Sequence, residues 1–287
     1  MMRIGLVGNR RYRPLSDLLA RLAEEAPRLG VELVYEPQVA ELVHGAEGTE
    51  LHEAKLDIIL SLGGDGTLLR AARIGCHRGI PVLGINLGRL GFLAGAGPEQ
   101  APEALRRLVR GQYTVERRLA LAARIGDDGP QAVAVNDVVI HKGGVARVIR
   151  LSVSVDGEAV GTYSADGIVI ATPTGSTAYS LSAGGPIVVP SVDGFVITAI
   201  SPHTLGVRPL VVPATATVAI RVLDPVPDPD ELLVSIDGQA TAHLKVRQDV
   251  TIMRAAEAVL LAQISDESFF ARLSRKLAWG DLGERKS

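Results

Sequence analysis

The sequence predicts an α/β amino-terminal domain, a parallel sheet with flanking helices, followed by a β-rich, sandwich-like carboxyl-terminal domain. Three observations support this prediction. The first hundred residues alternate short apolar runs with stretches of helical spacing, whereas residues 114–264 form β-branched runs of period two separated by Gly, Pro and Asp. The length of 287 residues also suits two domains. We place the domains at 1–100 and 101–265, with 266–287 packing back on the first.

In the first domain, apolar residues recur at helical spacing between Leu15 and Leu29, and Gly30 is a stop signal for that helix. Strands and helices in alternation indicate a parallel sheet that binds ligands at the carboxyl ends of its strands. The expected strands are 3–8, 31–35, 57–62 and 80–85, and the expected helices are 16–29, 67–74 and 99–109.

In the second domain, Asp156-Gly157 and Asp237-Gly238 are hairpin signals, so the strands should be mostly antiparallel. Residues 267–277 have a helical pattern again. The expected strands are 132–140, 147–155, 167–171, 195–200, 217–223, 232–236 and 250–253.

The composition excludes several classes of function. Thirty Lys and Arg balance 32 Asp and Glu, and aromatic residues make up 3%, which disfavours a nucleic-acid-binding surface. The single cysteine, Cys76, excludes an intramolecular disulfide. Because the sequence shows neither an export signal nor a membrane-spanning apolar run, we expect a cytoplasmic protein that binds neither membranes nor nucleic acid.

The glycine-rich turn Gly63-Gly64-Asp65-Gly66-Thr67 joins an expected strand to an expected helix. Glycines let phosphate oxygens approach the backbone, and a helix amino terminus attracts anions. Asp65 would repel a phosphate unless a divalent cation intervenes or its carboxylate accepts a proton from an attacking hydroxyl. The structural alternative is a tight turn in which Asp65 caps the helix.

The pair Asn136-Asp137 interrupts an otherwise apolar run. Neighbours in a strand point to opposite faces, so at least one of the two should face the core or a cleft. An amide and a carboxylate together suit a ribose diol. The alternative is a polar pair at the edge of a hairpin.

A third segment has six Ser or Thr residues in the eleven positions from Thr172 to Ser182. It follows an expected buried strand and leads into a short helix. Polar clusters on loops are often functional, and the hydroxyls with the ring of Tyr179 suit a nucleotide. The alternative is a purely structural turn, which needs only one or two such residues.

Together these segments resemble the NAD kinase family. The resemblance covers about residues 3–270 and rests on the glycine-rich turn, on the Asn-Asp pair and above all on the central motif from Thr172 to Gly185. Further motifs in the same order are 84–93, 201–205, 208–210 and 237–239. The glycine-rich turn is shared with phosphofructokinases and diacylglycerol kinases, which belong to the same superfamily.

The resemblance implies transfer of the γ-phosphoryl group of ATP to the adenosine 2′-hydroxyl of NAD, with Asp65 as general base. It further implies Mg²⁺ or another divalent ion, held mainly by ATP phosphates, and a homodimer or homotetramer. Many family members have Glu where this chain has Asp137. The implied substrate-binding residues are Gly63, Gly64, Asp65, Gly66, Thr67, Arg70, Asn136, Asp137, Arg147, Ser164, Asp166, Thr174, Thr177, Ala178, Tyr179, Ser180, Leu181, Ser182 and Gln239.

Two alternative functions are left open by the residues. One is a lipid or sugar kinase of the same superfamily, and the other is a non-catalytic protein that senses NAD. Polyphosphate in place of ATP as donor is also open. The cluster Arg10, Arg11 and Arg13 is either a solvated loop or part of a phosphate site.

Overall fold

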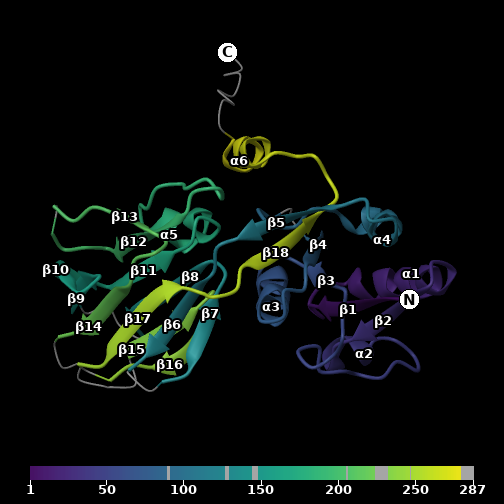
Figure 1. The fold of residues 1–287 in the computed structure, drawn as a ribbon, viewed down its shortest axis with the longest axis horizontal. Coiled ribbons are helices and arrows are strands. Elements are labelled where there is room, and N and C mark those ends of the chain that lie inside the picture. The colour runs from purple at the N-terminus through teal and green to yellow at the C-terminus, as the bar shows by residue number, and fades with distance from the viewer. Residues whose placement is uncertain are drawn as a thin grey trace, which may run out of the picture. The chain divides into compact units, whose positions relative to one another are not determined.

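The computed structural model describes residues 1–88, 91–126, 129–143, 148–204, 206–223, 232–245 and 247–278. The chain forms two compact units, one of Met1–Arg117 with Leu260–Ser287 and one of Arg118–Val259 (Figure 1). The first unit extends further than the predicted 1–100 and 266–287. The reason is that α4 (Ala101–Val109) packs on α1 (Leu15–Arg28), and β5 (Thr114–Arg118) lies beside β18 (Val259–Gln263) in one sheet.

The sheet of the first unit has the strand order β2-β1-β3-β4-β18-β5. β1 pairs in parallel with β2 and β3, and β4 pairs in parallel with β3 and β18, as predicted for an α/β domain. Every residue of β3 is buried, which is typical of a central parallel strand covered on both faces. The strand bounds are β1 Met2–Gly8, β2 Val31–Tyr35, β3 Ile58–Gly63 and β4 Val82–Asn86.

Helices cover both faces of this sheet. The apolar stripe of α1 packs with α4 against Leu60 and Leu83. Their neighbours Ser61 and Gly84 point to the opposite face, where a Cβ on Gly84 would lie 2.4 Å from Leu68 of α3 (Asp65–Cys76). The remaining helices of the unit are α2 (Pro37–Ala40), η1 (Pro98–Gln100) and α6 (Phe269–Leu277).

The second unit is a sandwich of two antiparallel sheets. One sheet has the order β10-β9-β14-β17-β6-β7 and the other β13-β12-β11-β8-β15-β16. Their inner faces share one core, to which Phe195, Val153 and Ile252 contribute from both sheets. The bounds are β6 Leu121–Ile125, β7 Gln131–Ala134, β8 Asp137–Lys142, β9 Ile149–Val155, β10 Glu158–Ala165, β11 Gly167–Ala171, η2 Gly175–Thr177, α5 Tyr179–Ser182, β12 Gly194–Ile200, β13 Leu210–Pro213, β14 Val218–Val222, β15 Leu232–Ile236, β16 Gln239–His243 and β17 Asp249–Arg254.

The predicted single strand over 132–140 is wrong, because the chain changes sheets within it. β7 pairs with β6 in the first sheet, and β8 pairs with β11 and β15 in the second. Val135 and Asn136 form the break between them, and this break places Asn136 at the end of β8 rather than inside a strand. Within the described residues, no helix is long and apolar enough to span a membrane.

Candidate active site

The glycine-rich turn joins β3 directly to α3, as the sequence predicts. Gly63 ends the strand, and a Cβ there would lie 2.3 Å from the Oγ1 of Thr67, so a side chain does not fit. A Cβ on Gly66 would meet nothing within 4 Å. Asp65 and Gly66 are the first residues of the helix, so their N–H groups have no partner within it and suit an anion.

Tyr12 lies against this turn, which the sequence does not indicate. A Cβ on Gly64 would lie 2.8 Å from the Tyr12 hydroxyl oxygen, and one on Gly88 would lie 2.9 Å from the edge of the ring. The ring therefore fits between two glycines.

Of the neighbouring arginines, Arg10 forms an exposed ion pair with Glu41, which favours the solvated-loop interpretation for that residue.

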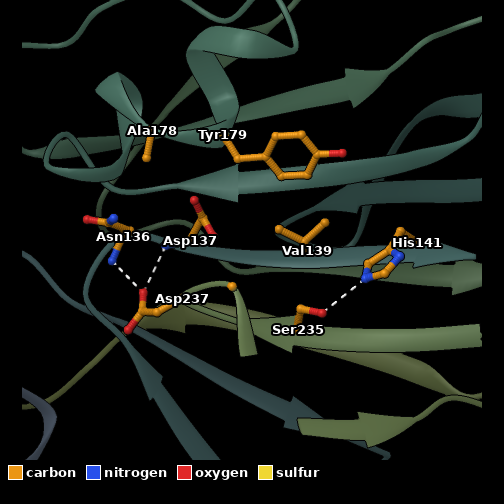
Figure 2. A pocket seen from close by; sticks show the side chains of 9 residues that line it. Asn136, Asp137, Val139, His141, Ala178, Tyr179, Ser235 and Asp237 are labelled. Carbon is orange, nitrogen blue, oxygen red and sulfur yellow. Dashed lines mark hydrogen bonds between the residues drawn. The ribbon is translucent and has the colours of Figure 1, made fainter. Parts of the chain in front are cut away.

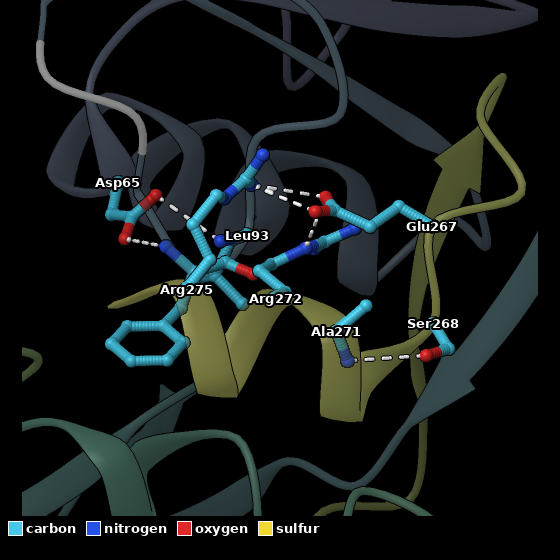
Figure 3. Close-up of polar contacts among 8 residues, drawn as sticks. Asp65, Leu93, Glu267, Ser268, Ala271, Arg272 and Arg275 are labelled. Carbon is cyan, nitrogen blue, oxygen red and sulfur yellow. Dashed lines mark hydrogen bonds and ion pairs between the residues drawn. The ribbon is translucent and has the colours of Figure 1, made fainter. Parts of the chain in front are cut away.

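The carboxylate of Asp65 is held by the backbone of a neighbouring loop (Figure 3). Its two oxygens accept hydrogen bonds from the Phe92 N–H at 2.8 Å and the Leu93 N–H at 3.3 Å. A Cβ on Gly91 would lie 1.8 Å from Asp65 Oδ1, so a side chain there would displace the carboxylate from this position. The alternative in which Asp65 caps α3 is wrong, because the N-cap position is occupied by Gly64. The two bonds use about half of the lone pairs of a carboxylate, and the others are left for a hydroxyl.

Arg70 has a different environment from the one expected of a phosphate ligand. Its guanidinium donates to Glu36 at 2.9 Å and to the Gly8 carbonyl at 2.8 Å. Glu36 is 5% exposed and also accepts the Gly8 N–H at 2.7 Å. A buried carboxylate needs such partners. Arg70 thus joins α3 to the end of β1, and its predicted contact with substrate stays a prediction.

The second unit contains a cavity of about 390 Å³ on the outer face of its second sheet (Figure 2). Alternation along β8 turns Asp137, Val139 and His141 toward the cavity, whereas Val138 and Ile140 belong to the core. The opposite wall comes from the segment that joins η2 to α5. The lining residues are Asn136, Asp137, Val139, His141, Ala178, Tyr179, Ser235, Asp237 and Gly238.

Asp237 holds the strand break that carries Asn136 and Asp137. Its Oδ1 accepts the N–H of Asn136 at 2.7 Å, of Val135 at 3.1 Å and of Asp137 at 3.3 Å. Asn136 Oδ1 is buried and has no hydrogen-bond partner among the residues that the structure describes. A buried acceptor without a partner is costly, so this oxygen is suited to a donor on a ligand, such as a ribose hydroxyl.

Asp137 is 4% exposed and lies near a second carboxylate. Burial, and secondarily the charge of Asp237, raise the pKa of Asp137 to about 7. The folded protein therefore retains a proton between about pH 4 and pH 7 that the unfolded chain has lost. The contribution of Asp137 to the unfolding free energy therefore declines as the pH rises from about 4 to about 7.

We expect Asp137→Asn to flatten that decline. Between pH 5 and pH 8 the wild type should lose up to about 3 kcal/mol more unfolding free energy than the variant, because about two pH units separate pH 5 from the folded pKa of about 7. Urea unfolding at both pH values measures this difference. Glu158→Gln, at an exposed carboxylate of β10, should keep the slope of the wild type. Parallel slopes for wild type and Asp137→Asn would show that Asp137 ionises normally.

Several hydroxyls of the central motif serve the turn itself. Ser180 is fully buried and hydrogen-bonds Thr198 at 3.1 Å. Ser176 donates to the Pro173 carbonyl at 2.7 Å, and Thr177 donates to the Thr174 carbonyl at 3.2 Å. The richness in hydroxyls thus partly reflects the folding of a tight segment, an alternative that the sequence left open.

The cavity brings together four of the predicted residues, Asn136, Asp137, Ala178 and Tyr179. The other lining residues were not predicted as site residues, although Asp237-Gly238 was visible both as a hairpin signal and as part of the 237–239 motif. Arg147 lies outside the described residues. The predicted residues of this unit that do not line the cavity are Ser164, Asp166, Thr174, Thr177, Ser180, Leu181, Ser182 and Gln239.

Comparisons with known proteins agree with this two-unit organisation. Residues 4–113 match the ATP-NAD kinase N-terminal domain, and residues 135–264 match the ATP-NAD kinase C-terminal domain. The chain is 45% identical to the NAD kinase of Gemmatimonas aurantiaca, over 99% of this chain and 98% of the relative. It is 42% identical to the NAD kinase of Heliobacterium modesticaldum, over 93% of each.

Two solved structures have the same fold. An NAD kinase from Archaeoglobus fulgidus in complex with ATP gives a TM-score of 0.74 at 27% identity, covering 96% of this chain and 99% of that one. Yeast NADH kinase complexed with NADH gives a TM-score of 0.90 at 22% identity, covering 100% of this chain and 90% of that one. From the two matched domains and the full-length similarity, the chain belongs to the ATP-NAD kinase family.

Proposed function

We propose that this chain transfers the γ-phosphoryl group of ATP to the adenosine 2′-hydroxyl of NAD and so produces NADP. It is a phosphotransferase by family membership. The observation that supports the chemistry best is the Asp65 carboxylate, which two backbone N–H groups hold at the amino end of α3, beside the glycine-rich turn. A base and an anion-binding turn next to one another suit attack of a hydroxyl on a phosphate.

The donor side of the reaction rests on the turn from Gly63 to Thr67. Its N–H groups and the helix end bind phosphate oxygens and stabilise the negative charge. Asp65 accepts the proton of the 2′-hydroxyl as that oxygen forms its bond to the γ-phosphorus. The bond from the γ-phosphorus to the β,γ-bridging oxygen breaks, and ADP leaves. Phosphoryl transfer depends mainly on such positioning and charge stabilisation.

The acceptor side rests on the cavity of the second unit. Asn136 Oδ1 accepts from one ribose hydroxyl and thereby gains the partner that it lacks among the described residues. The ionised form of Asp137 accepts from another, and Tyr179, which is 45% exposed at the cavity wall, offers a ring to a base. The proposal requires that both units act on one NAD molecule.

A divalent ion such as Mg²⁺ fits the residues at the turn if phosphates supply most of its ligands. Asp65 has lone pairs left there, whereas Glu36 already accepts from Arg70, Gln38 and Gly8. Within the described ranges, no three His, Cys, Asp or Glu side chains gather as a metal site. When bound, the ion neutralises phosphate charge.

We also propose that the protein is a homodimer or homotetramer and that it is located in the cytoplasm.

Formation of NADP tests the function directly. The purified protein should convert NAD to NADP in the presence of Mg²⁺ and ATP, measured with a dehydrogenase that accepts only NADP. Polyphosphate replaces ATP in a parallel reaction to identify the donor. The 2′-deoxyadenosine analogue of NAD should give no phosphorylated product. Binding of NAD without any product from either donor would instead support the NAD-sensing alternative, and phosphorylation of a lipid or sugar alone would support the rival kinase.

A further inference from the structure

The last helix of the first unit contacts the loop that holds Asp65. In Figure 3, Arg272 of α6 points toward that loop, and its Nη1 donates to the Phe92 carbonyl at 2.7 Å. That carbonyl and the Leu93 N–H belong to the same peptide group, and the Leu93 N–H donates to Asp65 Oδ1 at 3.3 Å. A single peptide thus links the cationic Arg272 to the carboxylate of Asp65.

This arrangement strengthens the hold on Asp65 for an electrostatic reason. A guanidinium at the carbonyl oxygen polarises the peptide, so its N–H becomes a better donor to the carboxylate on the other side. The same contact fixes the orientation of the peptide, and with it the neighbouring Phe92 N–H that donates to Asp65 Oδ2 at 2.8 Å. Neither bond involves a substrate atom.

The surroundings of Arg272 hold its guanidinium in place. Its side chain is 8% exposed, although an arginine on a surface helix usually reaches solvent. Glu267 accepts from its Nε at 3.4 Å and also pairs with Arg275 at 2.9 Å. The ammonium of Lys276 lies 5.8 Å from the centre of the Phe92 ring. α6 therefore contacts Phe92 through both the backbone and the ring.

We propose that Arg272 is a positioning residue for phosphoryl transfer, which acts through the 92–93 peptide to keep the Asp65 carboxylate oriented. The inference rests on the proposed role of Asp65 as general base. It predicts that loss of Arg272 slows the chemical step, because a misplaced base is costly to the rate, whereas substrate binding at the glycine turn and at the cavity is preserved.

The test compares Arg272→Gln with a matched control, Arg275→Gln. Arg275 shares the partner Glu267 but has a half-exposed side chain, at 51%. Arg272→Gln should lower kcat by about 10- to 100-fold, as expected for a lost charged hydrogen bond, with the KM for NAD and ATP within about twofold. Arg275→Gln should keep kcat within about twofold. Equal losses in the two variants, or an unchanged kcat in Arg272→Gln, would overturn the inference.

Arg272→Lys provides rescue, because it keeps a positive charge that can reach the Phe92 carbonyl. Its kcat should recover to within about threefold of the wild type. This variant also tests the role of Arg272 if Arg272→Gln does not fold. A folded Arg272→Lys protein that loses activity tenfold or more would contradict a role based on positive charge at the Phe92 carbonyl.

A double-mutant cycle separates this role from general stability. In the Asp65→Asn background, Arg272→Gln should cost less than about threefold further, because the base that it positions is already gone. A full additional loss would mean that Arg272 acts elsewhere. If the wild type makes no NADP, the proposed function itself fails, and if Asp65→Asn is fully active, the base role and this inference fail together. An active wild type with normal Arg272→Gln removes this inference alone.

Discussion

Replacing Asp65 with Asn is expected to lower kcat by about 10²- to 10⁴-fold, the usual contribution of a general base. The amide still offers an oxygen to the Phe92 or Leu93 N–H, so the loop and the glycine turn should keep their structure. It cannot take the proton of the attacking hydroxyl. The Kd for NAD, measured by calorimetry, should stay within about twofold, because the variant leaves the cavity residues unchanged.

Asp17→Asn is the matched control for this experiment. Asp17 is an exposed acid in the first turn of α1, and its replacement removes the same charge from the same unit. Its kcat should equal that of the wild type. Asp65→Asn with near-normal turnover would exclude Asp65 as the base, whereas a variant that also stops binding NAD would point to a role in holding the substrate.

Gly175→Ala is expected to have the largest effect on the second unit. A Cβ at this position would lie 2.0 Å from the Asn136 carbonyl oxygen and 2.7 Å from its Cα. Both contacts are with backbone, so no side-chain rotation relieves them, and the segment from Val135 to Asp137 must move. We expect a loss of about 2–4 kcal/mol in unfolding free energy and at least tenfold weaker NAD binding.

Gly206→Ala is its control within the same unit, since a Cβ there would meet nothing within 4 Å. Its unfolding midpoint and NAD affinity should match those of the wild type. Urea unfolding and calorimetry measure both quantities. A Gly175→Ala protein with normal affinity would show that the position of Asn136 does not control NAD binding.

Local signals predicted the parts of the site that lie within one short segment. The glycines around Asp65 predicted the strand-to-helix turn, and the polar pair Asn136-Asp137, which interrupts an apolar run, predicted that at least one of the two faces the core or a cleft. These features depend on neighbours in the chain, because a turn needs glycine and alternation assigns faces. The antiparallel sandwich likewise followed from short β-branched runs and from hairpin signals.

What the sequence could not predict depends on contacts between distant residues. Arg272 is 180 positions from Phe92, and its pattern is that of an ordinary amphipathic helix. Asp237 is 101 positions from Asn136, whose N–H it binds. The sequence showed Asp237 as part of a hairpin signal and of the 237–239 motif, but not this contact. The split of the strand at Val135 results from the chain moving between two sheets, because periodicity in one segment does not reveal its partner strand.

A crystal structure of Asp65→Asn with NAD and a non-hydrolysable ATP analogue tests the central claim most directly. We predict that the side chain at position 65 lies about 2.6–3.2 Å from the adenosine 2′-oxygen, with the γ-phosphate at the glycine-rich turn. Asn136 Oδ1 should accept a ribose hydroxyl of the same NAD molecule. A 2′-hydroxyl that points away from residue 65, or an NAD adenosine bound outside the cavity lined by Asn136 and Asp137, would contradict the proposed mechanism.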